Sequence, residues 1–348
     1  MKSSCIYPYI FHPAWKDYLW GGRNLEKMGK HLPEGIIAES WEIAAHKDGQ
    51  SIVDNGPLKG LTLAELLHKL GRDLIGTALP EKDLLTFPLL IKFIDANDRL
   101  SVQVHPDDAY GSLFGDYGKN EAWYIVDAAP GSQLVYGLRP GTAREDFEKG
   151  LKAGTFESLL HRVDVKPGEV YDIPAGLIHA IGKGIMIVEV QQNSNLTYRV
   201  FDYNRTDREG NPRPLHIKDA LAVTRFPAAG ELPPKASSGI LFKLQSEIPE
   251  GEAIRTVYVV NRCFALETLQ LVRARIHVPG NKRNFMIHTV LSGRMEITWQ
   301  GTDGMQDLSV PRGQSVLLPA ALGPATLSGS FHSLVSYVPD PEFKIQAL

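Results

Sequence analysis

The sequence predicts a mainly β protein. Its 348 residues include 32 glycines and 23 prolines, and these turn-forming residues are scattered along the chain. Short apolar or alternating runs lie between them, and helical periodicity is almost absent beyond residue 240. A chain of this length can also form two domains, each with its own core. We therefore expect a mainly β fold in two domains, with a few short helices.

Helical signals are few and clear. Two capping boxes, Thr62-Leu-Ala-Glu65 and Thr142-Ala-Arg-Glu145, each precede apolar residues at helical spacing. The helices that they predict end near Gly71 and Gly154, since glycine is the usual residue just past a helix end. Shorter helices are expected over two further segments, 155–162 and 216–223.

The strands follow from runs of apolar and β-branched residues between turns. The run over 87–95 predicts a buried strand that contains Lys92, whose ammonium either reaches solvent or points into a site. Trp20 and Trp41 either anchor the core or line a pocket wall. Further strands are expected in this half of the chain over 123–127, 133–137, 167–173, 185–192 and 197–205.

A segment rich in proline, glycine, alanine and serine interrupts the chain at 226–240 and predicts a linker. We therefore expect a first domain over 1–225, which carries the chemistry, and a second β domain over 241–348.

The composition excludes several classes of protein. The net charge is −3 with no basic block, so nothing indicates a nucleic-acid partner. No apolar run reaches the roughly 18 residues of a membrane span, and the first residues lack the apolar core of a signal peptide. The two cysteines, Cys5 and Cys263, are too few for a disulfide framework. A reduced, cytoplasmic setting is expected.

One polar stretch stands out as a ligand wall. Ser101, Gln103 and His105 alternate with Val102 and Val104, so the three polar side chains leave one face of a strand. Three polar groups on one face would make a poor core.

The next polar residues complete a set of metal ligands. Lys119 and Glu121 lie two residues apart on the next extended segment, and His179 follows the turn Pro174-Ala-Gly176. Two imidazoles, one carboxylate and one amide oxygen suit a divalent cation such as Zn²⁺, with Mn²⁺, Fe²⁺ or Co²⁺ possible.

An internal repeat relates the two halves. The segment Gly168-Glu-Val-Tyr-Asp-Ile-Pro174-Ala matches Gly313-Gln-Ser-Val-Leu-Leu-Pro319-Ala, with the same spacing from glycine to proline. His179 lies five residues after the first proline, and Pro324 occupies that place in the second copy. The repeat predicts two related small barrels, of which only the first keeps a site.

The first copy of this repeat, with the upstream imidazole and glutamate, resembles the cupin superfamily. More narrowly, the chain resembles the type I mannose-6-phosphate isomerases of the short bacterial form, nearly end to end. The resemblance is carried by Leu19-Trp-Gly-Gly22, Glu39-Ser-Trp41, Pro88-Leu-Leu-Ile-Lys92, Leu100-Ser-Val-Gln-Val-His-Pro-Asp107, Lys119-Asn-Glu-Ala-Trp-Tyr124, Ile173-Pro-Ala-Gly-Leu-Ile-His-Ala180 and Gln192-Asn-Ser-Asn-Leu-Thr-Tyr-Arg-Val-Phe-Asp-Tyr203.

The resemblance implies two cupin (jelly-roll) barrels, the C-terminal one degenerate, and one Zn²⁺ per chain. It implies that the metal is bound by Gln103, His105, Glu121 and His179. The catalytic residues that it implies are Arg199, Lys119 and Glu189. The residues near the substrate would be Ser101, Lys119 and Arg199.

The implied reaction interconverts mannose 6-phosphate and fructose 6-phosphate through a cis-enediol. The general base stays open between Glu189 and a water on the metal. Each of these residues also has a non-catalytic interpretation. Lys119 could be a solvated loop lysine and Arg199 a surface ion-pair partner. Glu189 could orient a ligand histidine. A sugar phosphate is the expected partner, and the chain is expected to be a monomer or weak homodimer. A non-catalytic sugar-phosphate-binding cupin and another metal-dependent cupin enzyme are the alternatives.

Overall fold

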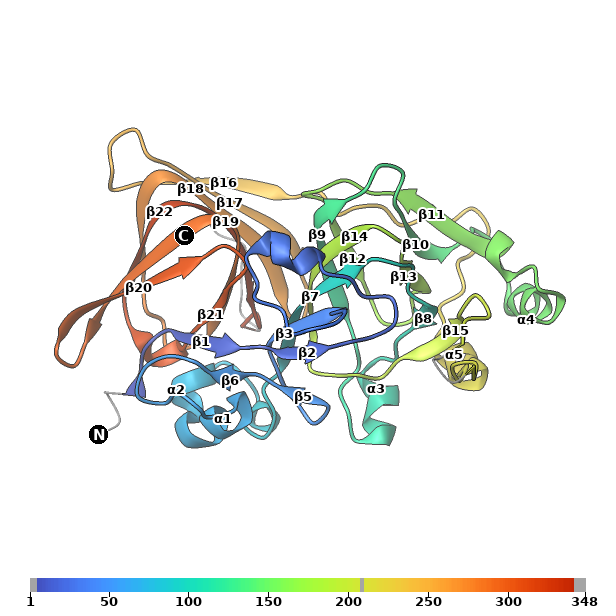
Figure 1. Cartoon of the computed structure of the whole chain (residues 1–348), viewed down its shortest axis with the longest axis horizontal. Helices are drawn as coiled ribbons and strands as arrows, with labels where there is room; N and C mark the ends of the chain where they lie inside the picture. Colours follow the sequence, from blue (N-terminus) through green and yellow to red (C-terminus); the bar gives the residue numbers. More distant parts are fainter. Residues whose placement is uncertain (1–4, 207–209, 341–348) are drawn as a thin grey trace.

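The computed structural model describes residues 5–206 and 210–340, and its strands form three large antiparallel sheets and one two-stranded ribbon (Figure 1). The prediction of a mainly β fold with few, short helices is confirmed. The number of closed barrels stays a prediction.

Two of the sheets face each other in the part of the chain before residue 206. The six-stranded sheet consists, in spatial order, of β12 (Val170–Ile173), β9 (Glu121–Ala128), β14 (Ile185–Gln192), β7 (Leu89–Ala96), β3 (Glu39–Ile43) and β2 (Ala14–Lys16). The five-stranded sheet consists of β11 (Leu160–Asp164), β10 (Gln133–Leu138), β13 (His179–Ile181), β8 (Val102–Val104) and β15 (Tyr198–Phe201).

A shared core joins these two sheets. Ile94, Trp123 and Ile187 of the six-stranded sheet pack in one buried cluster with Leu134 and Ile181 of the five-stranded sheet. Each strand alternates, so one set of side chains enters this cluster and the other set faces outward or toward the rest of the molecule. Packing of the two inner faces fixes which polar side chains enter the space between the sheets.

The remaining strands form a nine-stranded sheet that curves around a second core (left part of Figure 1). Its strands are, in spatial order, β16 (Ile240–Leu244), β17 (Glu252–Val260), β18 (Ala265–Val278), β22 (Ala325–Tyr337), β19 (Met286–Gly301), β21 (Ser315–Leu318), β1 (Tyr9–His12) and β6 (Ile52–Val53), with β20 (Gly304–Pro311) paired to β19. The separate ribbon pairs β4 (Ala45–His46) with β5 (Gly49–Gln50).

The strand β1 ties the start of the chain to the C-terminal sheet. Tyr9 pairs with Leu317 and Ile10 with Val316, although some 300 residues separate them in sequence. The segment predicted as a linker has no strand or helix up to Gly239, and its last residue, Ile240, begins β16. It runs along the first two sheets, where the Ser237 N–H donates to the Val170 carbonyl. The domain boundary at 226–240 stays a prediction. It assigns β1 to the first domain, whereas most strands of its sheet belong to the second.

The helices are short, as predicted. They are α1 (Leu63–Leu70), α2 (Arg72–Ile75), α3 (Asp108–Gly111), α4 (Arg144–Ala153), α5 (Ile217–Val223) and the 3₁₀ turns η2 (Asn24–Met28), η3 (Glu81–Leu84), η4 (Ser112–Phe114), η5 (Phe156–Leu159) and η6 (Ala320–Leu322).

The capping box predicted at Thr62 is confirmed, because the Thr62 hydroxyl accepts from the Glu65 N–H and the Glu65 carboxylate accepts from the Thr62 N–H. The box predicted at Thr142 is wrong by one residue. There the Asp146 carboxylate accepts from the Ala143 N–H, while the Thr142 hydroxyl donates to the Arg139 carbonyl.

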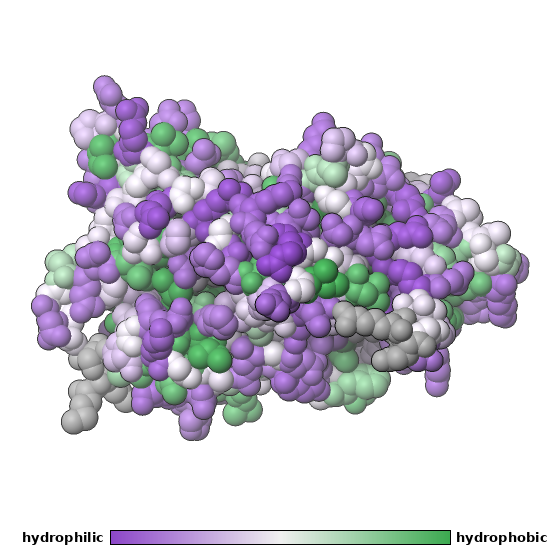
Figure 2. Space-filling model, in the orientation of Figure 1, coloured by the Kyte–Doolittle hydropathy of each residue, from purple (hydrophilic) through white to green (hydrophobic). Residues whose placement is uncertain are grey.

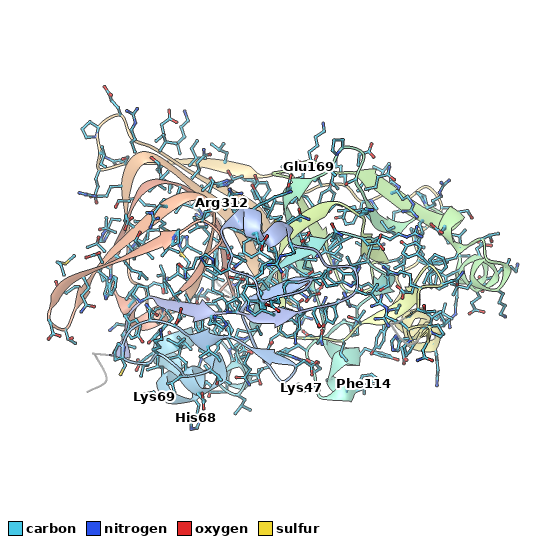
Figure 3. The ribbon with its side chains drawn as sticks, in the orientation of Figure 1. Lys47, His68, Lys69, Phe114, Glu169 and Arg312 are labelled. Carbon is cyan, nitrogen blue, oxygen red and sulfur yellow. The ribbon has the colours of Figure 1, made fainter. Side chains whose placement is uncertain are left out.

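None of the helices in the described ranges is long and apolar enough to cross a lipid bilayer. The face seen in Figure 2 is mostly hydrophilic, with hydrophobic residues in small separate areas. Exposed apolar side chains gather near α3, where Leu113 is 74% exposed and Phe114 is 52% exposed. Phe114 is labelled in the lower part of Figure 3.

Candidate metal centre and active site

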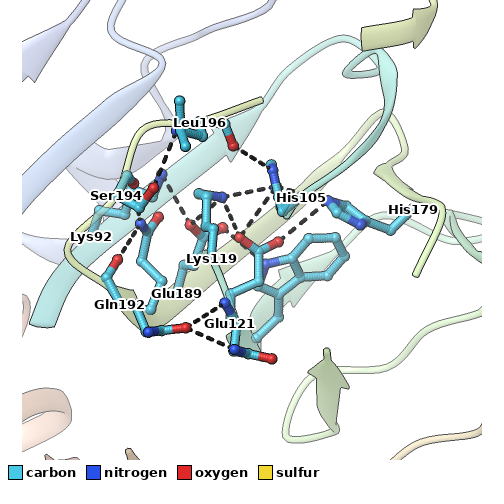
Figure 4. A network of polar contacts seen from close by, with 12 residues as sticks. Lys92, His105, Lys119, Glu121, His179, Glu189, Gln192, Ser194 and Leu196 are labelled. Atoms are coloured by element: carbon cyan, nitrogen blue, oxygen red, sulfur yellow. Dashed lines mark hydrogen bonds and ion pairs between the residues drawn. The ribbon is translucent and has the colours of Figure 1, made fainter. Parts of the chain in front are cut away.

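Three residues from separate strands converge between the two facing sheets. His105 follows β8, Glu121 begins β9 and His179 begins β13, and all three side chains are buried. One ligand atom from each lies within 4.8 Å of the others (Figure 4). Within the described residues this is the only such group of histidine, cysteine and carboxylate side chains. Strand pairing fixes the arrangement, because His179 pairs directly with Gln103 of β8.

Backbone carbonyls set the tautomer of both histidines. His105 Nδ1 lies 2.8 Å from the Leu196 carbonyl oxygen, and His179 Nδ1 lies 2.8 Å from that of Leu177. A carbonyl only accepts, so each Nδ1 carries the hydrogen and each neutral ring has its lone pair on Nε2. Burial, followed by the nearby Lys119 ammonium, lowers the pKa of His179 to about 3. The same two causes lower the pKa of His105.

The two Nε2 lone pairs point into the same space as a carboxylate. His105 Nε2 and His179 Nε2 lie 3.2 Å apart, and the Glu121 oxygens lie 3.5 and 3.4 Å from them. Glu121 Oε1 has no hydrogen-bond partner among the described residues. Burial and the neighbouring Glu189 charge raise the pKa of Glu121, although Lys119 opposes this.

This set fits a divalent cation. Buried lone pairs that face one another repel unless something positive lies between them. Neutral imidazole nitrogens, each with its other ring N–H on a carbonyl, together with one carboxylate, are the usual donors and supports of a protein-bound Zn²⁺. Gln103, the fourth predicted ligand, pairs with His179 and is half-buried. Its role as a ligand stays a prediction.

Lys119 is buried inside this cluster and is not a solvated loop lysine. Its Nζ lies 2.9 Å from His105 Nε2 and 3.7 Å from Glu189 Oε1, and it forms an ion pair with Glu121 Oε2. The ammonium therefore lies where the lone pairs converge, which shows that this space favours a positive charge. The Lys119 ammonium also lines the adjoining cavity, where Glu189 is a second anion close to it.

A second buried ion pair supports this wall. Glu189 on β14 pairs in register with Lys92 on β7, and the Lys92 Nζ lies 2.9 Å from Glu189 Oε1 and 3.6 Å from Glu39 Oε2. Burial alone would lower the pKa of Lys92, but the attraction of Glu189 and Glu39 outweighs it and raises the pKa. Lys92 is only 5% exposed, so it points into the site and does not reach solvent. Glu189 also accepts from Trp123 Nε1 at 2.9 Å, and within the described part of the chain it makes no hydrogen bond or ion pair with His105 or His179.

A cavity of about 300 Å³ lies beside the cluster. Its lining includes five of the residues predicted from the sequence to serve metal, substrate or catalysis. These are Ser101, Gln103, Lys119, Glu189 and Arg199. Trp20 also lines it, whereas Trp41 is fully buried and donates from Nε1 to Glu39. Both tryptophans therefore belong to the core, and Trp20 lines the cavity as well.

Comparison with known proteins decides the family. The family model of the type I phosphomannose isomerase catalytic domain matches residues 10–128. The probable mannose-6-phosphate isomerase GmuF of Bacillus subtilis is 35% identical over 335 residues, which cover 95% of this chain and 99% of GmuF. The chain belongs to the type I phosphomannose isomerase family. A second relative, mannose-6-phosphate isomerase ManA of Bacillus subtilis, is 43% identical over 226 residues, or 64% of this chain and 70% of ManA.

The fold agrees with this family over nearly the whole chain. The crystal structure of a mannose 6-phosphate isomerase from Bacillus subtilis superposes with a TM-score of 0.83 at 30% identity. The superposition covers 94% of this chain and 99% of that one. The resemblance expected from the sequence motifs is therefore confirmed, and both parts of the chain take part in it.

Two guanidinium groups, those of Arg199 and Arg213, lie at the mouth of the cavity in this phosphomannose isomerase family member. Arg199 Nε lies 3.3 Å from the Ser101 hydroxyl, and Nη1 donates to the Pro214 carbonyl at 2.9 Å. Burial, followed by repulsion from Arg213, lowers the pKa of Arg199. Arg213 makes two hydrogen bonds of 2.7 Å to Asp202. Arg199 is thus held by the wall of the site and is not a surface ion-pair partner.

The sequence did not identify several residues of the cavity wall as site residues. Those that line the cavity are Tyr18, Glu39, Asn195, Thr197 and Arg213. Three of them lie in the motifs that carry the family resemblance, which was the signal available. Tyr18 lies just before the Leu19-Trp20 motif. Arg213 has no such signal, because it stands between two prolines after a turn and only Asp202 brings it to the mouth.

Proposed function

We propose that the chain is a metal-dependent aldose–ketose isomerase that interconverts mannose 6-phosphate and fructose 6-phosphate. The observation that carries the proposal is the buried cluster of His105, Glu121 and His179 directly beside a cavity lined by Lys119 and Arg199. A metal centre next to fixed cations suits a reaction that builds negative charge on an anionic sugar. Membership of the phosphomannose isomerase family supports the same substrate.

The reaction moves the carbonyl group from C1 to C2. The C2 hydrogen of mannose 6-phosphate leaves as a proton while O1 gains a proton, which gives a cis-enediol. A proton then adds to C1 while O2 loses its proton, so C1 becomes an alcohol and C2 becomes a ketone. No external oxidant or reductant is needed. The protein must therefore supply a proton acceptor, stabilise charge on the two oxygens and hold the phosphate.

Zn²⁺ is the proposed metal, one per chain, and when bound it would supply Lewis acidity toward the sugar oxygens. The residues that would hold it are His105, His179, Glu121 and Gln103. The nitrogen and oxygen donors also suit other divalent metals, which metal analysis distinguishes.

Three cationic side chains of the chain are suited to bind the substrate and to hold a proton. Arg199, fixed by Ser101 and the Pro214 carbonyl, presents a planar cation at the mouth, where it can hold a phosphate or a developing oxyanion. Lys119 lies deeper, next to Glu121, and is suited to hold a proton near the reacting carbons. Arg213 adds a second cation at the mouth, so this entrance attracts an anionic substrate.

Glu189 is the proposed catalytic carboxylate on the chain. Burial alone would raise the pKa of Glu189, but Lys92 and Lys119 outweigh it and lower the pKa, so this carboxylate is ionised. An ionised carboxylate can accept a proton, while its pairing with Lys92 weakens it as a base. Glu189 is therefore placed in the site either as the base or as the group that keeps Lys92 charged.

The proposal is tested by a coupled assay on the purified protein. Mannose 6-phosphate is added, and fructose 6-phosphate formation is followed by a dye-linked enzyme, before and after treatment with a chelator. We expect turnover that the chelator abolishes and Zn²⁺ restores. Binding of mannose 6-phosphate by metal-loaded protein without any turnover would instead show a sugar-phosphate-binding protein. The same preparation, run on a gel-filtration column, tests the expected monomer or weak homodimer.

A further inference from the structure

The C-terminal sheet keeps a cavity at the place where the first two sheets hold the metal centre. In the first copy of the repeat, Ile173 of β12 pairs with Glu121 of β9. In the second copy the matching residue, Leu318 of β21, pairs with Met286 of β19. Met286 therefore occupies the register of the carboxylate ligand. His288, two residues on, leaves the same face of the strand.

This cavity has a volume of about 320 Å³ and a mainly apolar wall. Its apolar lining comes from several strands of the nine-stranded sheet and from the segment just before β19. Representative lining residues are Leu269, Ile276, Phe285, Leu327 and Val335. A thioether in place of the carboxylate, and a proline in place of the second histidine, remove the metal ligands. The wall that remains suits an apolar molecule.

Two polar atoms in this wall have no hydrogen-bond partner among the described residues, namely His288 Nε2 and Asn284 Oδ1. His288 is 1% exposed, and its other nitrogen lies 3.1 Å from the Ser333 hydroxyl. The Asn284 Nδ2 donates to the Val338 carbonyl, which leaves its oxygen as the free acceptor. Burial lowers the pKa of His288 to about 4, so the ring is neutral near pH 7. Buried polar atoms of this kind are normally satisfied.

The charged side chains of the cavity wall pair with one another. Arg255 makes two hydrogen bonds to Glu267, at 2.6 and 2.7 Å, and the Tyr337 hydroxyl donates to the same carboxylate at 2.6 Å. Arg283 pairs with Asp340 at the rim. Among the described residues of the wall, each cation thus has an anion beside it.

We propose that this cavity is a second ligand site, which binds a small, uncharged, mainly apolar molecule through a hydroxyl group held by His288 and Asn284. A hydroxyl both donates and accepts, so it can satisfy the Asn284 oxygen and the neutral imidazole together. The inference is independent of the isomerase activity, because its residues lie in the nine-stranded sheet or in the segments next to its strands, and none of them lines the catalytic cavity.

The test uses 4-propylphenol and propylbenzene, which differ only in the hydroxyl group. Binding to the full-length, metal-loaded protein is measured by ligand-observed NMR and calorimetry with saturating mannose 6-phosphate present, so that the catalytic cavity is occupied. We expect both probes to bind and the phenol to bind more tightly. His288→Leu should weaken the phenol about two- to tenfold, the range for one hydrogen bond, and leave propylbenzene within twofold.

The matched control is His332→Leu. His332 lies on β22 of the same sheet, packs edge-on against Tyr124 and does not line the cavity. It should leave both probes unchanged. Val335→Phe, which fills the cavity, should abolish binding of both.

One measurement needs no variant and guards against misfolding. The ¹⁵N resonances of His288 in the wild-type protein should shift on addition of 4-propylphenol and stay in place with propylbenzene. Binding of neither probe at millimolar concentration, or binding that survives Val335→Phe in a folded variant, overturns the proposal. In that case the two buried polar atoms are satisfied by water alone.

Discussion

Two backbone carbonyls determine the tautomers of His105 and His179. Each carbonyl fixes one ring nitrogen as a donor and so directs the lone pair of the other into the shared space. The spacing of polar residues along one strand predicted that the His105 side chain shares a face with Ser101 and Gln103. It could not predict the carbonyl of Leu196, because a carbonyl has no sequence signature.

The first prediction concerns a metal ligand. His179→Ala removes one of the converging lone pairs, so we expect loss of bound metal together with a fall in turnover on the order of 100-fold or more. Metal content by mass spectrometry and the coupled assay check both quantities. His161→Ala, a change on β11 away from the cluster, should keep both. A fully active His179→Ala protein without metal would contradict the ligand assignment.

The second prediction separates metal binding from substrate charge. Arg199→Lys keeps a positive charge but loses the planar fork that bonds to Ser101 and Pro214, so we expect normal metal content and about 10- to 100-fold lower kcat/KM. Arg225→Lys, an exposed arginine paired with Glu231, is the matched control and should behave like the parent. Parent-like kinetics for Arg199→Lys would show that the guanidinium is only structural.

At the scale of elements, the segment that follows β14 is what holds the first histidine in place. Buried Gln191 donates from Nε2 to the carbonyls of Gln192 and Ser194, at 2.8 and 2.7 Å. These two bonds shape the turn that brings the Leu196 carbonyl to His105. The element therefore acts as a support for the metal centre without contributing a ligand.

The third prediction tests this support. Gln191→Met keeps the side-chain volume but removes both donors, so the turn loosens and we expect about 10- to 100-fold weaker metal binding. A competition titration with a chromophoric chelator measures the affinity. Gln133→Met, at a surface glutamine that bonds to Asp164, should leave the affinity unchanged. Equal affinities in the two variants would show that the turn holds its shape without Gln191.

The sequence predicted a helix or strand correctly where a short local pattern of residues determines it. The box at Thr62 follows from four consecutive residues, whereas at α4 the choice between Thr142 and Ala143 depends on the Arg139 carbonyl, which captures the threonine hydroxyl. The burial of Lys119 was not predictable, because it depends on Glu121 and His105 meeting across two sheets. Pairing of Lys92 with Glu189 likewise appears only once β7 and β14 are neighbours.

The fourth prediction concerns strand β12 and pH. Burial raises the pKa of Asp172 to about 6, and its Oδ1 has no partner among the described residues. The folded state therefore resists ionisation of this carboxyl, so its favourable contribution is full below about pH 4 and is lost as the pH rises through 6.

Asp172→Asn cannot ionise, and we expect it to raise the free energy of unfolding by about 1–3 kcal/mol at pH 8 and by little at pH 4. Urea unfolding at the two pH values measures the difference. Asp164→Asn, on β11 of the five-stranded sheet, should not reproduce this pH-dependent gain. A loss of stability at pH 8 would contradict the argument.

At the scale of the whole molecule, the two parts of the chain share secondary structure as well as a contact surface. Strand β1 is part of the nine-stranded sheet, and Phe285 packs against Phe87 with the ring centroids 4.8 Å apart. The Ala78 N–H donates to the Arg283 carbonyl at 3.0 Å, so backbone also crosses the boundary. The composition of 226–240 indicated a linker, but pairing between residues 9 and 317 has no local signal.

The fifth prediction follows from this sharing. A fragment of residues 226–348 lacks β1 and β6 and exposes the edge of β21 together with Phe285, so we expect it to aggregate or to remain unfolded. A full-length protein cut only within 226–240, at an inserted protease site, retains every strand pair. It should stay folded and elute as one species with near-parent activity.

Circular dichroism of the fragment and gel filtration of the cut protein distinguish these outcomes. Adding a peptide of residues 5–16 to the fragment tests the role of β1 alone, and we expect only partial rescue because β6 and Phe87 are still missing. A well-folded fragment with a cooperative thermal transition would show that the C-terminal sheet is an independent unit. In that case the pairing of β1 with β21 is a docking contact between two autonomous domains.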